Sequence, residues 1–137
     1  ITTLDRVGLR DVADKKVSNF SQGMEKRLAL AMAVVGSPDL LLLDEPLTSL
    51  DPYGVRLVRE AIQSEINRGT TVLFSSHVLG QVELVCDRVG ILYQGELIGD
   101  GSLSVLRAEV GLDPDATAED VFVEFVDDRA ARENTDR

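Results

Sequence analysis

The sequence predicts an α/β fold with a parallel sheet at its core, and three observations support this. Leu40–Leu43 are continuously apolar, which is typical of a strand buried on both faces of a parallel sheet. A second apolar and β-branched run, 70–76, predicts a second buried strand. Between them, Asp51-Pro52 is a strong helix start, and apolar residues at helical spacing continue to about Asn67. Strand, helix and strand in this order predict parallel pairing through a right-handed crossover.

A helix over 20–35 is expected before the first strand. Ser21 suits its N-cap, because a serine hydroxyl can accept a hydrogen bond from a free backbone N–H of the first turn. Gly23 costs up to about 1 kcal/mol against Ala in a helix, and the cost makes sense if a group approaches the backbone closely. A phosphate at the helix start is one such group, and an ordinary capped helix with an incidental glycine is the alternative. The predicted buried face is Met24, Leu28, Ala31 and Val35.

After the second strand, a helix over 78–86 and a two-stranded hairpin over 88–99 are expected, with Gln94-Gly95 as its two-residue turn. We expect Gly99-Asp100-Gly101 to form a turn. A capped helix should follow over 102–109, and then a linker. Thr117–Asp120 has capping-box spacing and predicts the start of a last short helix. Residues 102–127 are thus a helical extension. Residues 128–137 are charged or small, which predicts a disordered tail.

Length and composition bound the possible functions. The chain has 137 residues, enough for one modest domain, and a net charge of -10, which argues against binding nucleic acid. The only cysteine, Cys86, excludes an internal disulfide. No signal peptide or membrane-spanning run is apparent. Because Ile1 is not an initiator methionine, we expect further sequence upstream.

Two carboxylates follow the leucine run directly. Asp44 and Glu45 are successive, so their side chains should leave the strand end on opposite sides and could take different roles. Ligands of open α/β sheets bind beyond the carboxyl ends of strands. A carboxylate there can hold Mg²⁺ or act on a water, although apolar runs that end in an acid are also common without any such role. His77 follows the second strand, where a structural and a functional histidine are about equally plausible.

Four motifs in this order and spacing resemble the carboxyl-terminal half of the ATP-binding subunit of ABC transporters. Ser21-Gln22-Gly23-Met24 is similar to the signature motif of that family, and Leu40–Glu45 to its Walker B strand with the catalytic glutamate. Ser49-Leu50-Asp51 is similar to the D-loop, and His77 to the switch histidine. The resemblance covers residues 1–101, and it implies a partial ABC-type P-loop NTPase fold.

The resemblance also implies what these residues do in Mg²⁺-dependent hydrolysis of ATP. Asp44 would hold Mg²⁺ through water, Glu45 would polarise the attacking water, and His77 would contact the γ-phosphate. The signature residues Ser21, Gln22, Gly23 and Met24 would grip a nucleotide held by a second ATP-binding subunit, and Ser49 and Asp51 would link the two sites. The expected partners are that second subunit and a membrane permease, at the cytoplasmic face of the cell membrane.

Some positions depart from the family pattern. The usual signature is Leu-Ser-Gly-Gly-Gln, so Phe20, Gln22 and Met24 differ, whereas Ser21 and Gly23 are kept. No segment matches Gly-x-x-x-x-Gly-Lys-[Ser/Thr], the Walker A loop that cradles phosphates. The chain by itself is therefore expected to bind Mg-ATP weakly, if at all, and not to turn it over.

Two other functions fit the same motifs. One is a soluble ABC-type ATPase of DNA repair or translation, although no heptads precede Ser21 and the acidic charge disfavours nucleic acid. The other is a non-catalytic binding module, which would not need Asp44, Glu45 and His77 together. Stretch 119–122 is loosely similar to the carboxyl end of subunits that pair with exporter-type permeases, which favours the transporter.

The abundance of aspartate and the scarcity of lysine predict a protein adapted to a salt-rich cell interior. The only lysines are Lys15, Lys16 and Lys26. Because salt screens the repulsion within an acidic surface, the midpoint of thermal unfolding should rise as KCl is raised to molar concentration. Circular dichroism during heating measures this midpoint, and a protein that is most stable at low salt would contradict the prediction.

Overall fold

The computed structural model describes residues 2–135, which divide into two compact units with the boundary between Val78 and Leu79. The division differs from the expected boundary at residue 101. The predicted hairpin belongs to the second unit, because its strands pack on the helices that follow them.

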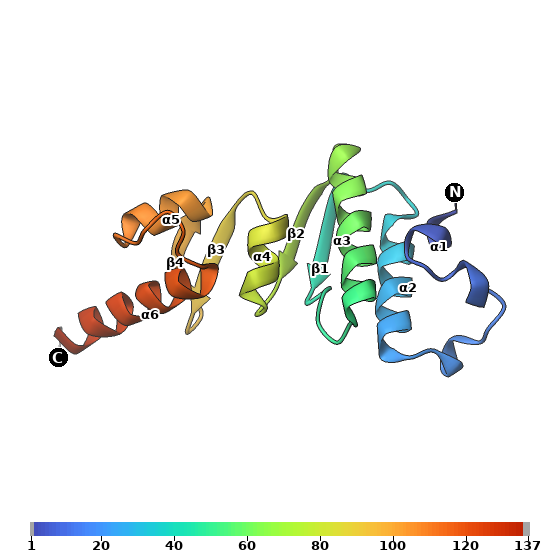
Figure 1. Cartoon of the computed structure of the whole chain (residues 1–137), viewed down its shortest axis with the longest axis horizontal. Coiled ribbons are helices and arrows are strands. Elements are labelled where there is room, and N and C mark those ends of the chain that lie inside the picture. Colours follow the sequence, from blue (N-terminus) through green and yellow to red (C-terminus); the bar gives the residue numbers. More distant parts are fainter. Residues whose placement is uncertain (1, 136–137) are drawn as a thin grey trace. The chain divides into compact units, whose positions relative to one another are not determined.

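The first unit is a two-stranded parallel sheet with helices. Strand β1 (Leu40–Asp44) pairs with β2 (Thr71–Ser75) in parallel, from Leu40 opposite Thr71 to Asp44 opposite Ser75. Helix α3 (Pro52–Asn67) makes the crossover and lies along the strands, with α2 (Gln22–Val34) on its other side (Figure 1). The chain before α2 forms α1 (Thr3–Arg6) and two 3₁₀ turns, Arg10–Val12 and Val17–Asn19. The predicted parallel α/β order is confirmed.

The described residues cover mainly one face of this sheet, so the prediction that the leucine strand is buried on both faces is wrong. The second strand was predicted to be buried, but none of its residues is fully buried. Leu41 is 3% exposed, whereas Leu40 and Leu42 on the opposite face are 54% and 65% exposed. Leu73 of β2, which lies opposite Leu42, is also 65% exposed. The alternation follows from strand geometry, because successive side chains point to opposite faces.

Both predicted helix caps of the first unit are present. Ser21 Oγ accepts a hydrogen bond from the Met24 N–H at 3.2 Å, and Asp51 Oδ1 accepts one from the Gly54 N–H at 2.7 Å. The predicted buried face of α2 is only partly right. Leu30, Ala31 and Val34 are the buried residues of this helix, whereas Val35 at its end is 69% exposed.

One buried charge connects the start of the chain to α3, and the sequence pattern did not predict it. The Glu65 side chain is fully buried, and its Oε1 accepts hydrogen bonds from Arg6 at 2.5 Å and from Arg68 at 3.4 Å. A buried carboxylate requires such partners, because an uncompensated charge in the interior is strongly destabilising.

The second unit contains an antiparallel hairpin and three helices, of which α5 and α6 pack on the hairpin and α4 packs on α6. Strands β3 (Val89–Tyr93) and β4 (Glu96–Gly101) follow α4 (Leu79–Val85) and precede α5 (Leu103–Glu109) and α6 (Ala118–Thr135). The turn is Gln94-Gly95 as predicted, and both residues have positive φ, as a two-residue hairpin turn of this type requires. The core of this unit contains Ile91, Leu106, Val121 and Phe125.

Two expectations about this unit are corrected. Gly99-Asp100-Gly101 is not a turn but the end of β4, where a Cβ on Gly99 would lie only 2.9 Å from the Phe125 ring. Residues 128–135, expected to be disordered, continue α6 to Thr135, and Arg129 of this helix pairs with Glu96 of β4. The predicted capping bonds between Thr117 and Asp120 are present at the start of α6. Residues 136–137 of the expected tail lie outside the described residues.

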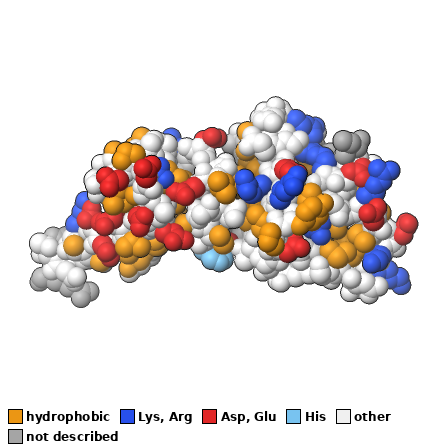
Figure 2. Space-filling view, viewed as in Figure 1, with side chains coloured by type: hydrophobic (Ala, Val, Ile, Leu, Met, Phe, Trp, Pro, Cys, Tyr) orange, Lys and Arg blue, Asp and Glu red, His pale blue; other side chains and the backbone are white. Residues whose placement is uncertain are grey.

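Among residues 2–135, no helix has the length and apolar character needed to cross a bilayer. Figure 2 shows acidic side chains spread over the visible face of the second unit. All three lysines are in the first unit.

Gly99→Ala should destabilise the protein, because the added methyl group would clash with Phe125 in the core of the second unit. We expect a loss of about 1–3 kcal/mol in the free energy of unfolding, the usual range for overpacking. Urea denaturation measures it. Gly80→Ala is the matched control, since a Cβ on Gly80 would meet nothing within 4 Å. Equal stability of the two variants would contradict the packing described here.

Candidate functional site

The candidate site lies at the carboxyl ends of β1 and β2 in the first unit. Because Asp44 is opposite Ser75 in the parallel register, the ends of both strands present polar groups side by side. The Ser75 hydroxyl donates to Asp44 Oδ1 at 2.6 Å and accepts from the Glu45 N–H at 3.0 Å. Ser75 thus orients both the side chain of Asp44 and the backbone of Glu45.

The Glu45 carboxylate is held by two side chains. Its Oε1 lies 2.8 Å from His77 Nδ1, and its Oε2 accepts a hydrogen bond from the Thr48 hydroxyl at 2.7 Å. The contacts with His77 and then Thr48 lower the pKa of the Glu45 carboxyl below its ordinary value. Glu45 is therefore a carboxylate at neutral pH, and its side chain remains 31% exposed, open enough to meet a water or a ligand.

The side chains of Asp44 and Glu45 bond to different partners, as predicted from the alternation of successive side chains along a strand. Asp44 bonds to Ser75, whereas Glu45 bonds to Thr48 and His77. The sequence therefore anticipated both the separation of the two carboxylates and the arrival of His77 at the same edge.

The backbone that carries Glu45 is unusual. Glu45 has φ of 47° and Ser49 has φ of 63°, both in the left-handed region that residues other than glycine seldom adopt. Backbone in such regions costs of order 1–3 kcal/mol and persists where surrounding contacts over-determine it. The Thr48 N–H closes this turn on the Glu45 carbonyl at 3.3 Å. Residues 45–49 are called the carboxylate turn below.

The start of α2 packs beside the carboxylate turn. A Cβ on Gly23 would lie 3.3 Å from Leu50 Cδ2 and 3.7 Å from the Ser49 carbonyl oxygen. Close packing against Leu50 is thus one reason for glycine in this first helical turn. Ser21 and Gln22 are exposed, and Met24 is half-buried.

The structure gathers the predicted site residues into two neighbouring groups. Asp44, Glu45 and His77 are linked through the ends of the strands, and the Ser21–Met24 turn adjoins Ser49 and Leu50. Asp51 is occupied as the N-cap of α3. Sequence reasoning missed three side chains that support this site, Lys26, Thr48 and Ser75. Ser75 could have been found from strand register, whereas no local signal marks Lys26.

The donor set near Asp44 fits Mg²⁺ only in part. Among residues 2–135, no group of three or more His, Cys, Asp and Glu side chains could enclose a metal ion. Mg²⁺ is typically bound by one or two carboxylates together with waters and substrate phosphates. The exposed Asp44 carboxylate, oriented by Ser75, suits that manner of binding.

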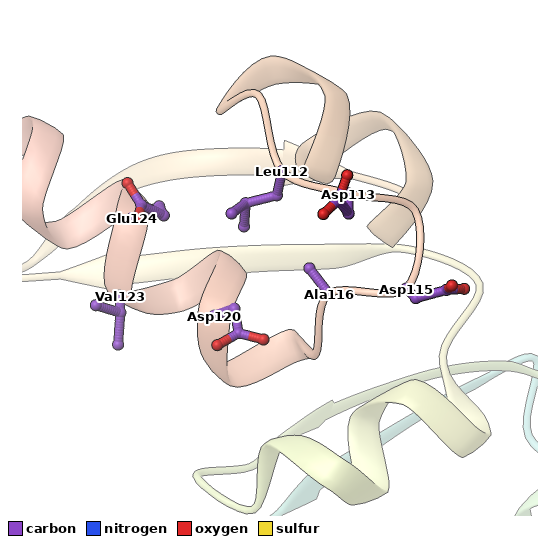
Figure 3. Close-up of a pocket in the computed structure, with 7 residues that line it drawn as sticks. All are labelled: Leu112, Asp113, Asp115, Ala116, Asp120, Val123 and Glu124. Carbon is purple, nitrogen blue, oxygen red and sulfur yellow. The ribbon is translucent and has the colours of Figure 1, made fainter.

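One pocket lies in the second unit and contains none of the predicted site residues. It has a volume of about 460 Å³ and lies between the loop before α6 and that helix (Figure 3). Its lining is mostly acidic, and Asp120 already bonds to Thr117. This pocket does not extend the candidate site.

Comparison with known proteins supports the same assignment as the motifs. The sequence profile of the ABC transporter family matches residues 1–48. An ATP-binding subunit of an ABC transporter has a matching structure with a TM-score of 0.83 and 28% identity, over 90% of this chain and 51% of that one. A second, CbiO1 of Clostridium perfringens, part of the ABC transporter complex CbiONQ, has a TM-score of 0.65 and 33% identity, over 78% of this chain and 43% of that one.

The family profile, the relatives and the solved structures together support an ABC nucleotide-binding domain. The chain shares 46% identity over 105 residues with an uncharacterised ABC transporter ATP-binding protein of Nostoc, over 75% of this chain and 31% of that protein. The lantibiotic transport protein SrtF of Streptococcus pyogenes is 43% identical over 69% of this chain and 42% of its own length. This ABC-type chain thus spans less than half the length of these relatives, and its fold is a partial P-loop NTPase fold.

Removing either partner of Glu45 should raise the pKa of its carboxyl, because each favours the charged form. We expect an increase in His77→Ala and a smaller one in Thr48→Val. Titration of the Glu45 side-chain ¹³C signal, assigned with Glu45→Gln, measures both. Thr48→Ser keeps the hydroxyl and should keep the low pKa. An unchanged pKa in both His77→Ala and Thr48→Val would contradict the geometry of the site.

Proposed function

We propose that the chain forms the carboxyl-terminal half of an ATP-binding subunit that hydrolyses ATP and couples hydrolysis to transport across a membrane. The observation that carries the proposal is the Glu45 carboxylate at the end of β1, ionised and oriented by His77 and Thr48 beside Asp44. Phosphoryl transfer depends mainly on positioning and on neutralising charge. This group of side chains supplies the positioning, and a cation held by Asp44 would supply the neutralisation of charge.

Each side chain has a distinct part in this proposal. Glu45 orients and polarises the attacking water. Its lowered pKa suits this part, since the carboxylate stays charged at neutral pH. His77 contacts the γ-phosphate from the same strand edge. Asp44 would hold Mg²⁺ through water, and the ion would supply neutralisation of the charge on the phosphates.

The helix start at Ser21 completes a site on a second subunit. Ser21 is exposed, and the first turn of α2 carries free backbone N–H groups of the kind that bind phosphate. In this proposal, the signature residues Ser21, Gln22, Gly23 and Met24 grip ATP held by the partner subunit. Ser49, whose carbonyl oxygen lies near that turn, and Asp51 link the two sites of a head-to-tail dimer.

The Walker A loop comes from residues outside the 137 of this chain. The chain alone is then inactive, and it acts as part of a subunit at the cytoplasmic face of the membrane, paired with a permease. A relative named as a Nod factor export protein, from Burkholderia orbicola, is 40% identical over 80% of this chain and 36% of its own length. That name supports export as the direction of transport.

Glu45→Gln should abolish hydrolysis in the protein that combines this chain with its Walker A half. We expect a fall of at least about 100-fold in kcat, the lower end of what a positioned acid or base contributes. Phosphate release measures it. The control is Glu60→Gln, which removes an exposed carboxylate that pairs only with Arg56 among the described residues. Undiminished turnover in Glu45→Gln, or robust turnover by the 137-residue chain alone, would contradict the proposal.

A further inference from the structure

Lys26 connects the signature helix to the carboxylate turn. Its ammonium group donates to the Glu45 carbonyl oxygen at 3.0 Å and to the Thr48 carbonyl oxygen at 2.7 Å. Lys26 is part-buried, and none of the ion pairs formed by residues 2–135 includes it. Its charge is thus directed to backbone oxygens, where charge-assisted hydrogen bonds are stronger than neutral ones.

The two carbonyl groups that accept hydrogen bonds from Lys26 belong to the residues that position the Glu45 carboxylate, namely Glu45 itself and Thr48. Glu45 itself has the left-handed backbone, and Thr48 donates its hydroxyl to Glu45 Oε2. The Glu45 carbonyl also accepts the Thr48 N–H, so the ammonium joins a turn that already closes on itself. Loss of the ammonium would remove two of the hydrogen bonds that hold this turn, in which both Glu45 and Ser49 have strained backbone.

Because Lys26 lies in α2, its hydrogen bonds connect the carboxylate turn to that helix. Ser21 caps the helix that carries Lys26, and the first turn of α2 packs against Leu50 through Gly23. A helix moves as a unit over one or two turns, so a displacement of its start displaces the ammonium as well.

We propose that Lys26 is a positioning residue that holds Glu45 in its productive place and ties that place to the signature helix. The proposal rests on the proposed function, since it concerns how Glu45 is positioned for hydrolysis. Lys26 touches no reacting group, and it acts through the backbone of the carboxylate turn. A misplacement of about 1 Å can cost on the order of 100-fold in rate, so a backbone anchor at this position has a large effect.

The test compares Lys26→Met, Lys26→Arg and Lys15→Met in the complete protein. Lys26→Met keeps the length of the side chain without its donors and should lower kcat at least about tenfold, with a smaller change in KM for ATP. Lys26→Arg can donate to both carbonyls and should recover most of the rate. Lys15→Met removes the charge of an exposed lysine in the same unit and should leave the rate unchanged.

A double-mutant cycle separates positioning from general loss of structure. If Lys26 acts through Glu45, adding Lys26→Met to Glu45→Gln should change the residual rate less than twofold. An equal loss in both backgrounds, or normal turnover in Lys26→Met, would overturn the proposal. Absent turnover in the unaltered protein, or turnover that survives Glu45→Gln, would instead count against the proposed function.

Hydrogen exchange gives a readout that does not need turnover. In Lys26→Met, the amides of residues 45–49 should exchange faster, while those of α3 and the midpoint of thermal unfolding stay as in the unaltered protein. Unchanged exchange in the carboxylate turn would overturn the proposal even in an inactive protein. Faster exchange throughout the first unit would do the same, since it would assign Lys26 a merely structural role.

Discussion

The parallel pairing of β1 with β2 is the constraint on which the rest of the first unit depends. It sets Asp44 opposite Ser75, and so brings Glu45 and His77, which are separated by the whole of α3, to the same edge. A shift of one residue would turn every side chain of a strand to the other face and separate these groups. The α3 crossover maintains the parallel pairing, and Asp51 fixes where that helix begins.

The carboxylate turn positions the Glu45 carboxylate at that edge of the sheet. A glutamate and a serine with positive φ are an unusual pair within five residues, and the cost is offset by contacts that converge on the turn. Ser75 bonds to the Glu45 N–H, Thr48 and His77 bond to its carboxylate, and Lys26 bonds to its carbonyl. Four side chains therefore specify the position of one carboxylate, in accord with the general need of functional groups for support behind them.

Much of this could be predicted from local pattern. Ser21 and Asp51 are helix caps and Gln94-Gly95 is a hairpin turn because each signal acts over a few residues. The family was also identifiable, since four short motifs in order carry more information than any one of them. The misses concern longer-range packing. Leu40 and Leu42 look like buried strand residues but lie on a face that no described residue covers, and residues 128–135 join α6, where Arg129 meets Glu96 of β4.

The sequence by itself determined the kinds of element, their caps and turns, and the presence of Asp44, Glu45 and His77 at strand ends. These features follow from side-chain chemistry acting on neighbouring backbone. The tertiary structure alone decided that Thr48 and Ser75 orient the carboxylates, that Glu65 is buried with Arg6, and that Lys26 reaches the carboxylate turn. Such contacts join residues from different elements, and their partners are chosen by how helices and strands pack, which no local pattern encodes.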